Sequence, residues 1–362
     1  MSKASASGPN GTRKHRPAKG HVTISDVADL AGVSIKTVSR VINHEPNVRP
    51  ATAERVHKAI QTLDYLPDPS ARGLAGQQSW MIGLIYENPS PNYLFRSILG
   101  ALQACNKGGY ALSMHSPEPN EDDLARMVER FVSQSRVDGL LLTPPVGDVP
   151  AVLDALERIG LPCVRVAPLD GRPGLGVCID DRSAAARVVD HLIELGHRRI
   201  GFVKGHPDHG ASDARQDGYR LSLMHHGLPI DESLEAQGQF DFESGHQAGI
   251  QLLELKSPPT AIFAANDEMA AGVMQAAQQL GWRIPDDLSV AGFDDTPLSR
   301  SLWPPLTTVH QPIRHMALRA TELLIEQIAR RNRDEPQPEG PSLQLFDAPL
   351  VVRATTAPPP AR

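Results

Sequence analysis

Polar side chains that could bind a small polar molecule directly follow two short apolar stretches. Asn266 with Asp267 follows AIFAA, and Asp294 with Asp295 follows VAGF. Carboxylates and amides form hydrogen bonds with vicinal hydroxyl groups. In parallel sheets, ligands bind beyond the carboxyl ends of the strands. The pattern therefore favours a cleft for a polyhydroxy ligand, although each pair could instead only form a turn or cap a helix.

A loop with the same character follows the first apolar stretch, WMIGLI. Its sequence, YENPSPNY, contains Glu87, Asn88, Asn92 and Tyr93. We expect Glu87, Asn88 and Tyr93 to contact the same ligand. The alternative for each of these residues is again a purely structural role, in a turn or as a helix cap.

The chain has no recognisable catalytic set. It lacks a Gly-x-Gly-x-x-Gly motif after the first strand, a phosphate-binding loop and a Gly-x-Ser-x-Gly motif. His206 and His209 are close in sequence in GHPDHG, but no cysteine or carboxylate at metal-ligand spacing completes a site. We expect neither an enzyme nor a bound metal, and no cofactor.

Residues 23–43, TISDVADLAGVSIKTVSRVIN, predict two short helices joined by a tight turn. Thr23 and Asp26 have the spacing of a capping box at the first helix. Gly32 supplies the turn, and Ser34 can cap the second helix.

The second of these helices has an apolar back and a polar front. Its apolar residues return onto the first helix, whereas the outward residues are Ile35, Lys36, Thr37, Ser39 and Arg40. A helix that enters the DNA major groove needs this division. Lys36 can donate to guanine, and Ile35 can contact a thymine methyl group. A helical hairpin within a core is the alternative.

The wider sequence resembles the lactose and galactose repressor family. The similarity is carried by AGVSIKTVSRVIN, TAERVHKAIQTLDY and LPDPSARGLAG, and in the body by LGHRRIGFVKG, AIFAANDEMAAGVMQAAQQLG, IPDDLSVAGFDDTP and PPLTTVHQP. The resemblance implies a small all-α helix-turn-helix headpiece. It also implies an α/β periplasmic-binding-protein-like body of two doubly wound parallel-sheet subdomains.

The resemblance also assigns DNA contacts. It implies that the segment at 68–78 folds as a hinge helix on DNA and that Leu74 wedges into the minor groove. Asp68 and Pro69 depart from the family's Asn-rich hinge start, which leaves one phosphate contact in doubt, and a plain linker is the alternative. The expected DNA-binding residues are Thr23, Ser34, Ile35, Lys36, Thr37, Ser39, Arg40, Asn43, Ala71 and Leu74.

Two further ligand contacts follow from the resemblance alone. Arg215 matches an arginine that clamps ligand hydroxyls, and Phe240 matches an aromatic residue that stacks on a sugar, although Phe240 could simply be core. The expected effector-binding residues are therefore Glu87, Asn88, Tyr93, Arg215, Phe240, Asn266 and Asp294.

The body alternates apolar strands with amphipathic helices, which indicates parallel sheets covered on both faces. By resemblance, the chain crosses between two subdomains near Asp180, near Gln311 and beyond Arg330. The expected division is a basic, disordered tail (1–21), a headpiece (22–67), a hinge (68–78), a body (79–353) and a C-terminal tail (354–362). Within the body, one subdomain takes about 79–180 and 311–330, and the other takes about 181–310 and 340–353.

Charge is distributed unevenly along the chain. Residues 1–75 contain 11 Lys and Arg against 6 Asp and Glu, whereas the remainder contains 25 against 36. A basic end on an acidic body suits a protein that touches phosphates with one end only. The three cysteines, Cys105, Cys163 and Cys178, are far apart, and the sequence has neither a signal peptide nor a membrane span. We expect a cytoplasmic protein.

These features predict a sequence-specific transcriptional repressor that a sugar or glycoside releases from its operator. One headpiece covers little DNA, so we expect a homodimer on a pseudo-palindromic site. Two alternatives remain open: a regulator that a purine or phosphosugar corepressor tightens on DNA, and a cytoplasmic sugar-binding sensor.

Overall fold

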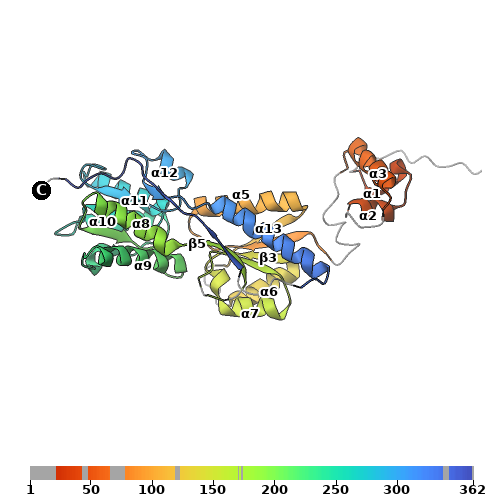
Figure 1. The fold of residues 1–362 in the computed structure, drawn as a ribbon, viewed down its shortest axis with the longest axis horizontal. Helices are drawn as coiled ribbons and strands as arrows, with labels where there is room; N and C mark the ends of the chain where they lie inside the picture. The colour runs from red at the N-terminus through yellow and green to blue at the C-terminus, as the bar shows by residue number, and fades with distance from the viewer. Residues whose placement is uncertain are drawn as a thin grey trace, which may run out of the picture. The chain divides into compact units, whose positions relative to one another are not determined.

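The computed structural model describes residues 22–42, 48–65, 78–118, 123–169, 171–172, 174–336 and 342–360. The chain divides into two compact units, Met1–Gly76 and Gln77–Arg362 (Figure 1). The expected basic tail, Asn43, Ala71, Leu74 and nearly all of the expected hinge lie outside the described residues.

The first unit contains the helices α1 (Ile24–Ala31), α2 (Ile35–Ile42) and α3 (Pro50–Leu63). The capping box at α1 is present, because the Asp26 amide donates to Thr23 Oγ1 at 3.4 Å and the Thr23 amide donates to Asp26 Oδ2 at 2.8 Å. Gly32 ends α1 in the left-handed region, with φ of 62°. A residue with a Cβ is disfavoured there, which is why the tight turn takes a glycine.

One apolar core joins the three helices of this unit. Val27 of α1, Val38 of α2 and Val56 of α3 are each 0% exposed. The two-helix arrangement expected from the sequence is therefore completed by α3, which packs against both α1 and α2.

The second unit begins with a six-stranded parallel sheet in the order β11-β5-β4-β3-β1-β2. Its strands are β1 (Met81–Ile85), β2 (Ala111–His115), β3 (Gly139–Leu142), β4 (Cys163–Val166), β5 (Leu175–Ile179) and β11 (Ser342–Phe346). Its helices are α5 (Pro91–Gly108), α6 (Leu124–Ser135), α7 (Pro150–Arg158) and α13 (Ile313–Asn332), with a short 3₁₀ turn at Val146–Asp148. The pair α5 and α13 covers one face of the sheet, and α6 and α7 cover the other (Figure 1).

A second parallel sheet has the order β7-β6-β8-β9. Its strands are β6 (Ile200–Val203), β7 (Glu235–Ala236), β8 (Ala261–Ala264) and β9 (Ser289–Ala291). Its helices are α8 (Asp181–Glu194), α9 (Gly210–His225), α10 (Phe242–Leu253), α11 (Asp267–Gln279) and the short α12 (Pro297–Ser301), with a 3₁₀ turn at Glu232–Leu234. Helix α8 packs on α9, and α10 packs on α11. The body therefore has the expected two-sheet α/β architecture.

The final part of the chain departs from the expected division. We expected 340–353 to belong to the second subdomain, but β11 pairs with β5 in the first sheet. Only after Phe346 does the chain cross over, where β12 (Leu350–Val351) pairs with β10 (Thr308–Val309) in an antiparallel ribbon. The reason is that β11 satisfies the backbone groups along the outer edge of β5. The third crossing thus lies beyond Arg330, at 347–349, but later than residue 340, where we expected the last segment of the second subdomain to begin.

Candidate functional site

A cavity opens where strands of both parallel sheets end. Asn88, Pro144 and Ala167 follow β1, β3 and β4 of the first sheet, while Asn266 and Asp294 follow β8 and β9 of the second. Its volume is about 40 Å³, which is room for a few waters, so a larger ligand can enter only if the surrounding side chains move apart. The residues that line the cavity are Asn88, Ser90, Tyr93, Pro144, Ala167, Asp181, His209, Ala211, Arg215, Phe240, Asn266, Asp294 and Gln311.

The cavity brings together six of the seven residues expected to contact the ligand. These six are Asn88, Tyr93, Arg215, Phe240, Asn266 and Asp294. Glu87 is adjacent in sequence to Asn88 but does not line the cavity.

Arg215 is the central charged group of this cavity. Its side chain is 5% exposed. Nε donates to Asp181 Oδ1 at 2.9 Å, Nη1 donates to the carbonyl of Ala265 at 2.5 Å, and Nη2 lies 3.5 Å from Gln311 Oε1. A buried guanidinium is tolerated only when its charge and its donors are matched in this way.

Two aromatic rings complete the surroundings of Arg215. The guanidinium carbon lies 3.7 Å from the ring centroid of Phe293 and 5.8 Å from that of Phe240. Phe240 is buried, and its ring lies so close to Gly205 that a Cβ at this glycine would come within 2.0 Å of it. Phe240 thus both packs in the core and lines the cavity, so the two interpretations of this residue coincide.

Asp294 is held in a strained and desolvated position. Its φ is 107°, which is rare for a residue with a side chain. Its Oδ1 is 3.7 Å from Arg215 Nη2 and has no hydrogen-bond partner among the residues that the structure describes. Burial raises the pKa of this carboxyl well above its usual range. A buried acceptor that faces a cavity and lacks a hydrogen bond is the group that a ligand donor would satisfy.

Asn266 was expected to contact the ligand, but its side chain mainly forms hydrogen bonds within the protein. Its Oδ1 accepts a hydrogen bond from the Met269 amide at 2.9 Å and so caps α11. Its Nδ2 donates to the Phe240 carbonyl at 2.8 Å and to Glu268 Oε2 at 3.1 Å. Asn266 lines the cavity, but its amide is already engaged in holding the cavity wall.

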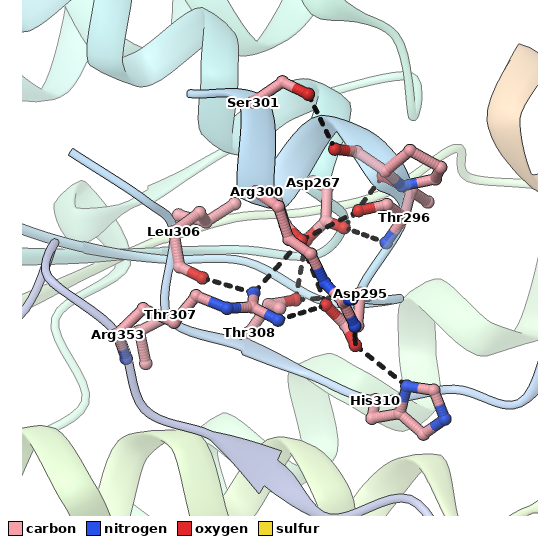
Figure 2. A network of polar contacts seen from close by, with 12 residues as sticks. Asp267, Asp295, Thr296, Arg300, Ser301, Leu306, Thr307, Thr308, His310 and Arg353 are labelled. Carbon is pink, nitrogen blue, oxygen red and sulfur yellow. Dashed lines mark hydrogen bonds and ion pairs between the residues drawn. The ribbon is translucent and has the colours of Figure 1, made fainter. Parts of the chain in front are cut away.

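The second member of each strand-end pair belongs to a network of polar contacts (Figure 2). Asp267 accepts hydrogen bonds from the Thr296 amide at 2.7 Å and from Thr308 Oγ1 at 2.6 Å, and burial raises its pKa to about 7. Asp295 binds Arg353 Nη2 at 2.5 Å and His310 Nδ1 at 2.9 Å. These carboxylates tie α11, β10 and the C-terminal segment together.

Two hydrogen bonds connect α5 to elements of the other subdomain. Asn92 Nδ2 donates to Glu268 Oε1 at 2.9 Å, and Arg96 Nη1 donates to the Asp295 carbonyl at 2.9 Å. Both bonds begin on the helix that covers the first sheet and end at the carboxyl edge of the second. They depend on the relative position of the two subdomains.

Sequence reasoning missed four polar residues that line the cavity: Ser90, Asp181, His209 and Gln311. Asp181 and Gln311 pair with Arg215. His209 is 3% exposed, and burial lowers its pKa to about 4. A signal existed for Asp181, because Asp180 and Asp181 directly follow β5, just as Asp294 and Asp295 follow β9.

The outward residues of α2 lie as the sequence predicts. Ile35 is 50% exposed, Lys36 and Arg40 are exposed, and Thr37 and Ser39 are partly buried. Ser34 Oγ accepts a hydrogen bond from the Thr37 amide at 3.2 Å and lies 2.9 Å from Thr37 Oγ1. The exposed start of α2 is thus a compact surface of one apolar and several polar side chains, which is the form that contacts base edges in the major groove.

Comparison with known proteins assigns the family. Residues 23–68 match the family of bacterial regulatory proteins, lacI family, and residues 189–356 match the periplasmic binding protein-like domain. The chain is 35% identical to the ribose operon repressor of Escherichia coli (strain K12) over 312 residues, which are 85% of this chain and 93% of that protein. It belongs to the lacI family. Members of this family are transcriptional regulators, so this protein is a DNA-binding transcriptional regulator.

Other lacI family relatives are similar over most of their length. The chain is 33% identical to the HTH-type transcriptional repressor PurR of Vibrio atlanticus (strain LGP32) over 320 residues, which are 86% of this chain and 94% of that protein. The Lac repressor dimer bound to operator and the anti-inducer ONPF superposes with a TM-score of 0.76 at 29% identity, over 93% of this chain and 100% of the other. The complex of the regulator CelR with cellobiose gives a TM-score of 0.69 at 29% identity, over 92% and 100%.

In the described part of the chain, no helix is long and apolar enough to cross a membrane. The described residues also contain no group of three or more His, Cys, Asp or Glu side chains that could hold a metal ion.

We predict that Arg215→Met lowers the free energy of unfolding by about 3–5 kcal/mol, because it leaves Asp181 and Asp294 buried without their cation. Arg182→Met is the matched control, since Arg182 forms an exposed ion pair with Asp217 and its loss costs less than about 1 kcal/mol. Urea denaturation measures both changes. Equal losses for the two variants would contradict the central place given to Arg215.

His209 makes stability depend on pH. Its pKa falls from 6.5 in the unfolded chain to about 4 in the folded protein, so the unfolded chain binds the proton first as the pH falls. The contribution of His209 is therefore complete above about pH 6.5 and is lost between about pH 6.5 and 4, to a total of about 3 kcal/mol. We expect the stability advantage of the wild type over His209→Asn to shrink across this window.

The exposed His225→Asn serves as the control for this measurement. Urea denaturation at several pH values between 4 and 7.5 gives the difference between each variant and the wild type. A constant difference for His209→Asn across the window would show that the folded protein does not hold this histidine neutral.

Proposed function

We propose that this regulator represses carbohydrate-utilisation genes and that a sugar or glycoside releases it from its operator. The observation that carries the proposal is the buried Oδ1 of Asp294, which accepts no hydrogen bond from the described residues, in a cavity that Arg215 and the ring of Phe240 also line. A sugar supplies hydroxyl donors for the acceptor and an apolar ring face for the aromatic side chain.

The seven residues expected to bind the effector have different roles in this proposal. Asp294 and Arg215 supply charged groups, and Asn88 and Tyr93 approach from the first subdomain. Phe240 supplies the apolar wall, and Asn266 maintains the shape of that wall through the Phe240 carbonyl. Glu87 is removed from direct contact, because it does not line the cavity.

DNA recognition is proposed for the α2 surface. Ile35, Lys36, Thr37, Ser39 and Arg40 are the described residues that would meet base edges and phosphates, with Thr23 and Ser34 at the starts of α1 and α2. The structure of the Lac repressor is that of a dimer on its operator. We propose the same homodimeric arrangement here, on a pseudo-palindromic operator in the cytoplasm.

The two activities are coupled through the body. The cavity is lined by residues of both subdomains, so a ligand there favours one of their relative positions. If that position is incompatible with operator binding, the ligand weakens DNA affinity, and DNA weakens ligand affinity by the same factor. Asn92 and Arg96 form hydrogen bonds between the two subdomains, and these bonds would change when the subdomains move.

The relatives support a sugar as the ligand, and they also support one alternative ligand. The CelR structure contains cellobiose, and another relative is named a ribose operon repressor. The relationship to PurR proteins favours, as a second candidate, a purine corepressor that tightens operator binding. The sign of the ligand's effect on DNA affinity separates the two functions.

The test begins with selection of an operator from randomised duplex DNA by the purified full-length protein. Operator affinity is then measured by fluorescence anisotropy at fixed salt, with and without mono- and disaccharides, plant glycosides, phosphosugars and purines. We expect at least one saccharide to weaken operator binding about tenfold or more. A purine that strengthens binding would favour corepression, and equal affinity with every compound would reject effector control.

We predict that Lys36→Ala changes which bases are preferred, because an exposed lysine at the start of α2 can donate to guanine O6 or N7. The change should cost about 1–3 kcal/mol at the affected position of the operator and little elsewhere. Selection from a randomised operator library at matched salt reads out the preference.

Arg40→Ala is the comparison variant for this prediction. We expect it to weaken binding to all sequences together, as the loss of a phosphate contact does. Unchanged base preference in Lys36→Ala would show that Lys36 contacts phosphate instead of bases.

A further inference from the structure

The charges that line the cavity do not favour an anion. Among the described lining residues, Arg215 is the one lysine or arginine, whereas Asp181 and Asp294 are both acidic. His209 adds no positive charge near neutral pH, because burial lowers its pKa to about 4. With both carboxylates ionised, the side chains at the cavity carry a net negative charge. With Asp294 protonated, the pair of Arg215 and Asp181 is still neutral overall.

The donors of Arg215 are also already in use. Nε binds Asp181 at 2.9 Å, Nη1 binds the Ala265 carbonyl at 2.5 Å, and Nη2 faces Asp294 Oδ1 and Gln311 Oε1 at 3.7 and 3.5 Å. A phosphate or carboxylate normally takes a guanidinium in a two-pronged contact. Here it would first have to displace the protein's own carboxylate.

Four helices begin at the cavity, and helix starts do attract anions. Three of these starts are capped by their own side chains, from Ser90 at α5, Asp180 at α8 and Asn266 at α11. Acidic residues in the first turns of α8 and α11 offset the helix dipoles further. The start of α9 has no side-chain cap, but Asp213 lies in its first turn. The protein's own side chains therefore already offset the positive ends of these helix dipoles.

One acceptor at the cavity lacks a hydrogen bond among the described residues. Asp294 Oδ1 is buried, lines the cavity and has no hydrogen bond among the described residues. A hydroxyl group brings the donor that this oxygen needs, whereas an ionised carboxylate or phosphate brings further acceptors and negative charge. Whenever Asp294 is ionised, placing an anion next to this oxygen is repulsive in a poorly solvated site.

We infer that the cavity selects an uncharged, hydroxyl-bearing sugar and excludes the phosphorylated and uronic acid forms of the same sugar. This inference rests on the proposed function of the cavity as the effector site, and it narrows that proposal to neutral saccharides. Asp181 and Asp294 would be the specificity-determining residues, with Arg215 positioned between them.

The inference is tested with matched sugars on the full-length protein at constant ionic strength. The pairs are ribose with ribose 5-phosphate, glucose with glucose 6-phosphate, glucose with glucuronate, and galactose with galacturonate, with cellobiose added as a neutral disaccharide. Melting temperature and calorimetric titration measure binding. We expect a neutral member to bind at least about a hundredfold more tightly than its anionic counterpart.

Two variants show whether the selection comes from the cavity. Asp181→Asn keeps an acceptor for Arg215 Nε but removes one negative charge, so we expect the preference for the neutral sugar to fall about tenfold. Asp217→Asn is the matched control, because Asp217 lies on α9, is exposed and pairs with Arg182 outside the cavity. The preference should be unchanged in this control. An unchanged preference in a folded Asp181→Asn protein would overturn the role of Asp181.

The failure of this inference can be distinguished from the failure of the proposed function. A phosphosugar or uronate that binds as tightly as its neutral counterpart and releases the operator would overturn charge selection but leave effector control intact. A panel in which no compound of either kind raises the melting temperature would count against both. The comparison in wild-type protein decides the main claim even if Asp181→Asn does not fold.

Discussion

The body of this regulator depends on the burial of one guanidinium group. Arg215 lies on α9 and has almost no contact with water. A buried cation must be matched by anions and acceptors, or the folded state loses several kcal/mol. The matching groups come from separate parts of the chain: Asp181 at the start of α8, Ala265 after β8, Asp294 after β9 and Gln311 before α13. The charge therefore fixes where these strand ends and helix starts meet.

The two residues of each polar pair after a strand have different roles. In the pairs at 266–267 and 294–295, the first residue lines the cavity and the second ties the surrounding elements together (Figure 2). The positive φ of Asp294 is maintained because its amide donates to the Val309 carbonyl at 3.0 Å and its carbonyl accepts from the Gln311 amide at 3.4 Å. The carboxyl group of Asp294, whose Oδ1 has no hydrogen bond among the described residues, is thus positioned before any ligand binds, which reduces the cost of ordering the site on binding.

Much of this arrangement could be predicted from the sequence, for identifiable reasons. Apolar runs that end in paired Asn and Asp residues indicated the strands and their polar ends, and the spacing of Thr23, Gly32 and Ser34 indicated the two helices of the headpiece. The functions of single residues were harder to predict. Asn266 caps α11, which the sequence pattern predicted as well as it predicted ligand contact. Glu87 does not line the cavity, although the next residue, Asn88, does.

The remaining differences arise from contacts between distant parts of the chain. Asp181 joins the site only because the fold brings the start of α8 to Arg215, 34 residues away. The sequence of β11 resembles that of any short apolar strand and does not state which sheet it joins. Its position beside β5 depends on the free edge of a sheet formed by residues about 165 positions earlier, which local patterns do not report.

The central claim is that one ligand-dependent equilibrium of the body controls both the cavity and the DNA-binding end. The most direct measurement is a calorimetric titration of the saccharide that gives the largest rise in melting temperature, into free protein and into protein saturated with its selected operator. The account predicts weaker saccharide binding on the operator, by the same factor by which that saccharide weakens operator affinity. Equal saccharide affinity in the two states would contradict the coupling and leave the cavity without a regulatory role.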